Sequence, residues 1–174
     1  MTNNDILRRL RYALSISNDQ MVEIFAKGNL TVTHAQLHSW LLKEAAEGEE
    51  QDPGFVPCPD SALSQFLDGF IALRRGVRED APPQVIPNRI NNNLILRKLR
   101  IGLNYKEEEM LGTLKLANFN LSKSELSALF RARDHKHYQD CGDQILRNFL
   151  SNARKYGGGP VEVAITSTDT EIET

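Results

Sequence analysis

The sequence predicts an all-α protein: a tandem duplication of a roughly four-helix unit, packed with pseudo-two-fold symmetry. Three observations predict this fold. First, residues 3–43 match the residues found 89 positions later, with 11 identities in 41 positions. Chance gives roughly two or three identities at ordinary residue frequencies. Second, helix-start signals and apolar residues at helical spacing recur in both copies. Third, the one β-favouring stretch, residues 161–166, lies in the tail.

The first helix of each copy carries the clearest repeat. The segment NNDILRRLR at residues 3–11 returns as NNLILRKLR at residues 92–100. Apolar side chains three and four residues apart share one face of a helix, and here they are Ile6, Leu7, Leu10 and Leu14. We expect Asn4, and Asn93 in the second copy, to cap this helix by accepting hydrogen bonds from free backbone N–H groups.

Capping boxes mark the starts of the next two helices. The stretch SNDQ at residues 17–20 has the spacing of such a box and opens a helix that stops at Gly28. A second box, THAQ at residues 33–36, has the counterpart SKSE at residues 122–125. Because different residues preserve the same signal, a helix start is expected at both places.

The last helix of the unit begins near Asp60 and ends at Gly76, and its counterpart runs from Asp143 to about Tyr156. The repeat continues here at an offset of 83 residues, with identities at Cys58, Asp60, Leu63, Phe66 and Leu67. Asp60 and Asp143 stand where N-caps are expected.

These elements divide the chain into four parts. Residues 1–76 and 92–157 are the two helical repeats, and residues 77–91 form a linker with three prolines. Residues 158–174, which contain four acidic residues and no Lys or Arg, are expected to be a disordered acidic tail. A unit of roughly 70 residues is marginally stable alone, so we expect one apolar core that spans both copies.

Composition narrows the class of protein. The 174 residues carry 21 Lys and Arg against 23 Asp and Glu, so no overall basic excess indicates a nucleic-acid partner. We expect a cytoplasmic protein without a membrane partner, because no apolar run reaches the roughly 18–20 residues of a membrane span. The two cysteines, Cys58 and Cys141, are expected to be reduced, buried and unliganded.

The motifs of both copies resemble a bacterial family catalogued as domain of unknown function 1456, the YehS-like proteins. The resemblance covers roughly residues 3–156. It rests on NNxILRxLR followed by CPDxxLSxFLxG, and on RxxDHKxYxxCGDQxLRxFL. It implies a duplicated cytoplasmic bacterial protein, and no known activity or functional residues.

Four basic residues are the candidate binding site: Arg8, Arg9, Arg97 and Lys98. Arg8 points nearly opposite the apolar face of its helix, so these charges are expected to be exposed. Two such helices related by a pseudo-two-fold axis can contact nucleic-acid phosphates in pairs. The structural alternative is that they form the solvated face of an amphipathic helix.

Metal binding and cysteine reactivity have weaker support. His135, His137 and Cys141 are conceivable metal ligands, but their spacing is wrong for a zinc finger, and a structural loop is expected instead. The matched cysteines have no matched cation beside them that would make a nucleophile or redox pair. We therefore expect no catalytic residues, no metal and no cofactor.

We expect a non-catalytic binding or regulatory module that acts through protein–protein contacts with an unidentified partner. The alternative is a nucleic-acid-binding protein that contacts phosphates through the four basic residues. The sequence leaves the oligomeric state open.

Overall fold

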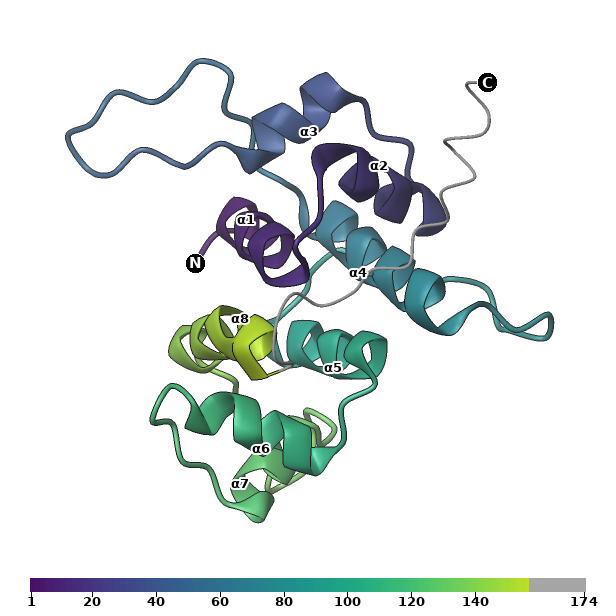
Figure 1. The fold of residues 1–174 in the computed structure, drawn as a ribbon, viewed down its shortest axis with the longest axis vertical. Coiled ribbons are helices and arrows are strands. Elements are labelled where there is room, and N and C mark those ends of the chain that lie inside the picture. Colours follow the sequence, from purple (N-terminus) through teal and green to yellow (C-terminus); the bar gives the residue numbers. More distant parts are fainter. Residues whose placement is uncertain (157–174) are drawn as a thin grey trace.

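A computed structural model describes residues 1–156. These residues form eight helices and no strand (Figure 1): α1 Asn3–Leu14, α2 Asn18–Lys27, α3 His34–Leu41, α4 Asp60–Arg75, α5 Asn92–Leu103, α6 Glu107–Lys115, α7 Lys123–Leu129 and α8 Asp143–Tyr156. The all-α prediction is confirmed for this part of the chain. The expected acidic tail at residues 158–174 lies outside the described residues.

The local signals account for most helix starts. Ser17 and Gln20 form the reciprocal capping box of α2, and Ser122 and Glu125 form that of α7. At α3 the box is half formed, because the Thr33 hydroxyl accepts from the backbone N–H of the residue three positions later without a reciprocal bond. Each bond satisfies an otherwise free N–H group of the first helical turn.

The prediction that Asn4 and Asn93 cap their helices is wrong. The caps of α1 and α5 are Thr2 and Asn91, each one residue before its helix. Asn4 lies inside α1 and is 1% exposed. Its side chain bonds to a segment far away in the sequence, because its Oδ1 accepts from the backbone N–H of Cys58 at 2.8 Å.

Asn4 and Asn93 each hold an extended segment against the first helix of their half. The Asn4 Nδ2 donates to the carbonyls of Val56 and Leu42. In the second half, the Asn93 Oδ1 accepts from the N–H of Cys141 at 2.9 Å. The Asn93 Nδ2 donates to the carbonyls of Leu129 and Gln139 at 2.9 and 2.8 Å. We call each arrangement an amide bracket.

The prediction that Asp60 is an N-cap is also wrong, because Pro59 holds that position and makes no side-chain bond. Asp60 is the first residue of α4, and its carboxylate accepts from Asn3 Nδ2 at 2.6 Å. Asp143, the first residue of α8, accepts from Asn92 Nδ2 at 2.7 Å in the same way. Both aspartates join the start of one helix to the start of another.

Helix α4 packs closely against α2 because glycines line the contact. A Cβ placed on Gly69 would lie 1.8 Å from the carbonyl oxygen of Ile24, and one on Gly28 would lie 1.8 Å from that of Gln65. The two backbones therefore approach more closely than any side chain permits.

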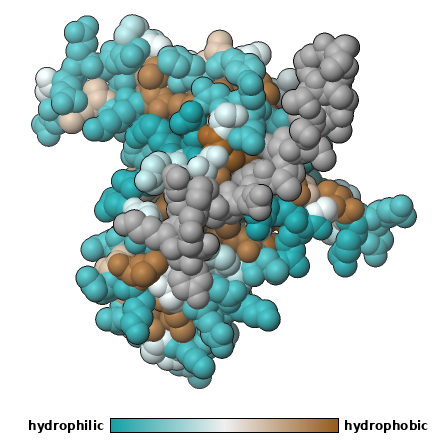
Figure 2. Space-filling view, in the orientation of Figure 1, coloured by the Kyte–Doolittle hydropathy of each residue, from teal (hydrophilic) through white to brown (hydrophobic). Residues whose placement is uncertain are grey.

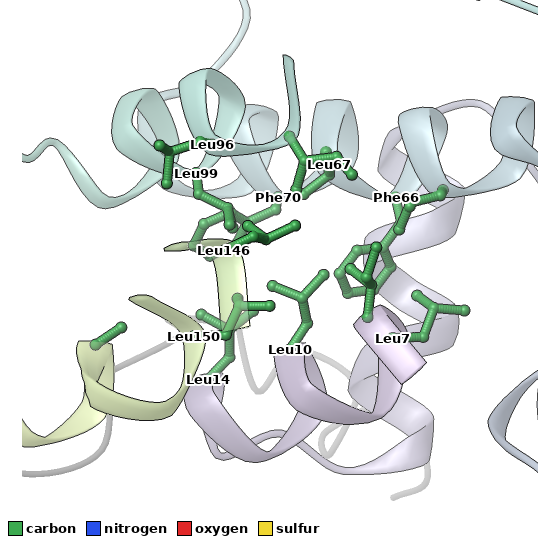
Figure 3. Packing of buried hydrophobic residues seen from close by; sticks show 14 of the residues in the cluster. Leu7, Leu10, Leu14, Phe66, Leu67, Phe70, Leu96, Leu99, Leu146 and Leu150 are labelled. Atoms are coloured by element: carbon green, nitrogen blue, oxygen red, sulfur yellow. The ribbon is translucent and has the colours of Figure 1, made fainter. Parts of the chain in front are cut away.

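The two halves share one core. Helix α4 packs on α5, and α1 packs on α8. Figure 3 shows leucines of α1 and α8 meeting aromatic and aliphatic side chains of α4 and α5. The buried cluster includes residues of all eight helices, so the expectation of a core spanning both copies is confirmed. None of the helices is long and apolar enough to cross a membrane within residues 1–156.

Candidate functional site

Lys98 is tied to the opposite half of the molecule. Its ammonium group pairs with the Asp68 carboxylate of α4 and lies 3.3 Å from the Ser64 hydroxyl. The Lys98 side chain is only 14% exposed. The prediction that this charge is exposed is wrong, because the packing of α4 on α5 covers it and supplies a carboxylate.

Arg8 is also neutralised locally. Its guanidinium pairs with Asp5 and donates to the carbonyl of Leu42 at 2.9 Å. Burial alone would raise the pKa of Asp5, but hydrogen bonds from Thr2 and the Arg8 charge lower it below its ordinary value. Asp5 is therefore ionised at neutral pH and balances the charge of Arg8.

Arg9 lies at the junction of the halves. It lines a recess of about 380 Å³ between α1 and α8, together with Leu150 and Ser151. Ser151 stands 83 residues after Asp68, the residue that pairs with Lys98 in the other junction. Arg9 therefore has a hydroxyl nearby where its counterpart has a carboxylate.

Arg8 and Arg9 line the same recess, whereas Arg97 lies beside cations that are not part of the predicted site. It donates to the carbonyl of Phe130 and borders a pocket of about 150 Å³. Arg131 and Arg133 line the same pocket, as does Tyr138. We call this the three-arginine pocket. No acidic side chain belongs to its lining among the described residues.

The cations of the three-arginine pocket are largely uncompensated. Among the described side chains of residues 1–153, those of Arg131 and Arg133 make no hydrogen bond or ion pair. The Tyr138 hydroxyl is buried beside the carboxylate of Asp140. Burial, together with this neighbouring carboxylate, raises the pKa of Tyr138, so the hydroxyl keeps its proton at neutral pH. The pocket thus combines three arginines with a protonated phenol.

Sequence reasoning missed Arg131, Arg133 and Tyr138, although the repeat contains a signal for the two arginines. At the 89-residue offset, four positions of the first half correspond to four of the second: Asp5 to Leu94, Arg8 to Arg97, Leu42 to Arg131 and Glu44 to Arg133. The charge at these positions is −1 in the first half, with one Arg against two acids, and +3 in the second. The two halves therefore differ in charge at these four positions.

Guanidinium groups that converge on a small space recognise oxyanions. Each presents planar N–H donors that match the oxygens of a carboxylate or phosphate group. With three such groups and no carboxylate, the three-arginine pocket can hold an anion that water would otherwise solvate. The prediction that all four basic residues bind nucleic acid stays a prediction, and only Arg97 belongs to this pocket.

The His135, His137 and Cys141 segment forms a loop between α7 and α8. The two imidazole rings lie 5.7 Å apart, and Nδ1 of His135 accepts from the backbone N–H of His137. Cys141 is buried and belongs to the apolar cluster. Within residues 1–156, no group of three or more His, Cys, Asp or Glu side chains is placed to hold a metal ion.

Both cysteines are free and buried, as predicted. Burial, reinforced by the carboxylates of Asp60 and Asp143, raises the pKa of Cys58 and of Cys141 to about 12. The reactive thiolate is therefore scarce at neutral pH.

Thiol labelling of the native protein is expected to be slow at both cysteines. At pH 8 a pKa of about 12 leaves on the order of a thousandfold less thiolate than the ordinary Cys pKa does. A chromogenic disulfide reagent should label both thiols rapidly in denaturant and neither in native buffer. Rapid labelling of the native protein would contradict the burial of the thiols.

The fold and the site define an all-α protein with an arginine-lined pocket in its second half. The chain belongs to the family described as protein of unknown function (DUF1456), whose sequence profile matches residues 3–76 and 92–154. It is similar to the uncharacterized protein YehS of Escherichia coli (strain K12), with 45% identity over 150 residues, or 86% of this chain and 92% of that protein. No solved structure matches this chain.

Proposed function

We propose that this protein is a non-catalytic binding or regulatory module that acts through protein–protein contacts and holds an anionic group of its partner in the three-arginine pocket. The observation that carries the proposal is the convergence of Arg97, Arg131 and Arg133 on one cavity without a neutralising carboxylate among the described residues. Uncompensated charge of this kind costs stability through repulsion, and a bound anion removes that cost.

A second cavity favours a protein segment as the ligand. A groove of about 470 Å³ lies beside the three-arginine pocket. Apolar side chains of Phe119, Leu121 and Ile145 line it together with the carboxylates of Glu125 and Asp140. Leu129 borders both cavities, and the segment at residues 138–140 contributes to both linings. A partner segment can place an anion in one cavity and an apolar side chain in the other. Figure 2 shows that apolar patches also interrupt the largely hydrophilic surface in both halves.

Nucleic acid is the second candidate partner, and the same three arginines favour it, since guanidinium groups bind backbone phosphates. The paired arrangement that supports such binding is weaker than the sequence indicates. Lys98 of the second half pairs with Asp68. In the first half, Arg8 and Arg9 share a recess with Asp5, which pairs with Arg8. A protein partner therefore has the stronger support.

Affinity capture from a nuclease-treated bacterial lysate separates the two candidates. We expect one defined protein to bind the wild type and the double variant Lys115→Gln/Lys123→Gln, and to be lost from Arg131→Gln/Arg133→Gln. Both variants remove two exposed or half-exposed cations from the second half, so overall charge is matched. Thermal unfolding of each variant checks its folding.

The other outcomes are equally informative. Loss of every partner after nuclease treatment would favour nucleic acid as the ligand of the pocket. Retention of every partner by a folded Arg131→Gln/Arg133→Gln variant would show that this pocket is not the binding surface.

We also infer that the halves are copies related by a pseudo-two-fold axis. The packing of α4 on α5 and of α1 on α8 supports this, because each pairs the last helix of one half with the first helix of the other. The two amide brackets support it further. Superposition of α1–α4 on α5–α8 in an experimental structure tests the inference, and unrelated chain paths would contradict it.

A further inference from the structure

We infer that the three-arginine pocket holds the terminal phosphate of a phosphate monoester, an assignment that rests on the function proposed above. The chemistry is shared by two sources, a phosphorylated side chain of a partner protein and a small phosphorylated metabolite. Both present a tetrahedral dianion at the end of a chain.

The size of the pocket fits a single phosphate group. Its volume of about 150 Å³ is well below the roughly 300–1,000 Å³ of cavities that enclose a whole drug-sized ligand. A terminal group can enter such a space while the rest of the ligand stays outside. The adjacent groove, which Leu129 also borders, can take a remainder that is apolar or basic, because Glu125 and Asp140 line it beside the apolar side chains.

The charge of the pocket distinguishes a monoester from a carboxylate. Three arginines line the cavity, and a phosphate monoester carries close to two negative charges at neutral pH. Its three terminal oxygens can accept from Arg97, Arg131 and Arg133 together. A carboxylate has one charge and two oxygens, so it satisfies fewer of these groups.

The same geometry disfavours a phosphodiester. A phosphate within a nucleic-acid strand carries one charge and is bonded to the chain on both sides, so the strand needs an open track rather than a recess. Further cations must then follow the strand at the spacing of its phosphates. Two of the three matched cations that would extend such a track, Arg8 and Lys98, are already paired with carboxylates, which leaves Arg9 alone to extend it.

In the first half, a carboxylate neutralises the arginine that corresponds to Arg97. Asp5 stands three residues before Arg8 and neutralises it, whereas Leu94 takes that position before Arg97. The variant Leu94→Asp therefore recreates the first-half pairing inside the pocket. Leu94 is only half-buried, so the change is compatible with folding.

Nuclear magnetic resonance titration of the ¹⁵N-labelled protein tests the inference, with the Arg Nε–H signals as the readout. The probes are N-acetyl-phosphoserine methylamide, adenosine 5′-monophosphate, dimethyl phosphate, N-acetylglutamate methylamide and a short single-stranded DNA. We expect the two monoesters to shift the signals of Arg97, Arg131 and Arg133 and to bind at least about tenfold more tightly than the diester or the carboxylate. The tighter of the two monoesters identifies the source of the phosphate.

Two variants complete the test. Leu94→Asp and Arg131→Gln/Arg133→Gln are expected to lose monoester binding, while Lys115→Gln/Lys123→Gln retains it. Equal affinity for the diester, the carboxylate or the DNA would overturn the inference and leave an anion-binding module. Absence of binding by every probe would overturn both the inference and the proposed function.

Discussion

Replacing Gly69 with Ala is expected to destabilise the protein by about 3 kcal/mol or more, at the upper end of the range for overpacked cores. The added Cβ would meet the Ile24 carbonyl oxygen at 1.8 Å and the Gly28 nitrogen at 2.9 Å. Both are backbone atoms, so no side chain can rotate away, and α2 must move off α4. Denaturant unfolding with circular dichroism measures the loss.

The sign of the change in unfolding free energy distinguishes a steric clash from an effect of helix propensity. In an unobstructed helix interior, Gly→Ala stabilises by roughly 1 kcal/mol, because Gly is the poorer helix former. Gly142→Ala is the control for an added methyl group without a clash, since a Cβ there meets nothing within 4 Å. Gly142 lies immediately before α8, so a small change in stability without the helix-propensity gain is expected there. Gly102→Ala should fall between the two, because its Cβ would meet the Phe70 ring at 2.6 Å, a side chain rather than backbone. A stabilising Gly69→Ala would contradict the close α2–α4 contact.

Replacing Asn93 with Ala is expected to cost about 3 kcal/mol, because a buried backbone donor and two carbonyls lose their partners together. The groups left unpaired are the N–H of Cys141 and the carbonyls of Leu129 and Gln139. The extended segment before α8 should then loosen. Faster labelling of the Cys141 thiol in the native variant, beside the lower unfolding midpoint, measures this effect.

A matched control separates the amide bracket from simple loss of volume. Asn93→Asp keeps the size and the acceptor for Cys141, but turns a carboxylate oxygen toward two carbonyls. Its neutral form fits better than its charged form, so its carboxyl pKa is raised in the folded state. The stability of this variant should therefore fall as pH rises above the ordinary Asp range, unlike that of the wild type. An Asn93→Ala variant as stable as wild type would contradict the bracket.

The predicted basic residues show that the partner of a charge can lie far away in the sequence. The basic helix segments were recognisable because they repeat, yet Lys98 pairs with Asp68, which lies 30 residues earlier in the chain. Nothing near Lys98 in the sequence indicates that partner. Conversely, Arg131 begins one of the family motifs and Arg133 lies inside it, but nothing in the sequence places either residue beside Arg97.

Asn4 and Asn93 show why a correct local signal can receive the wrong role. An Asn near a helix start is an ordinary N-cap, and the true caps, Thr2 and Asn91, are equally ordinary. The choice between them depends on Cys58 and Cys141, whose N–H groups arrive from 54 and 48 residues away.

The sequence by itself determined the helices and the burial of the matched apolar residues and cysteines. Helix capping and apolar periodicity depend on residues three or four positions apart, so they can be read from neighbours. The tertiary structure alone decided which cations are neutralised and which converge. Which cations are neutralised depends on which helices pack together. The packing of α4 on α5 places Asp68 beside Lys98, while the loop after α7 brings Arg131 and Arg133 to Arg97. Charge compensation acts through space, and the fold sets those distances.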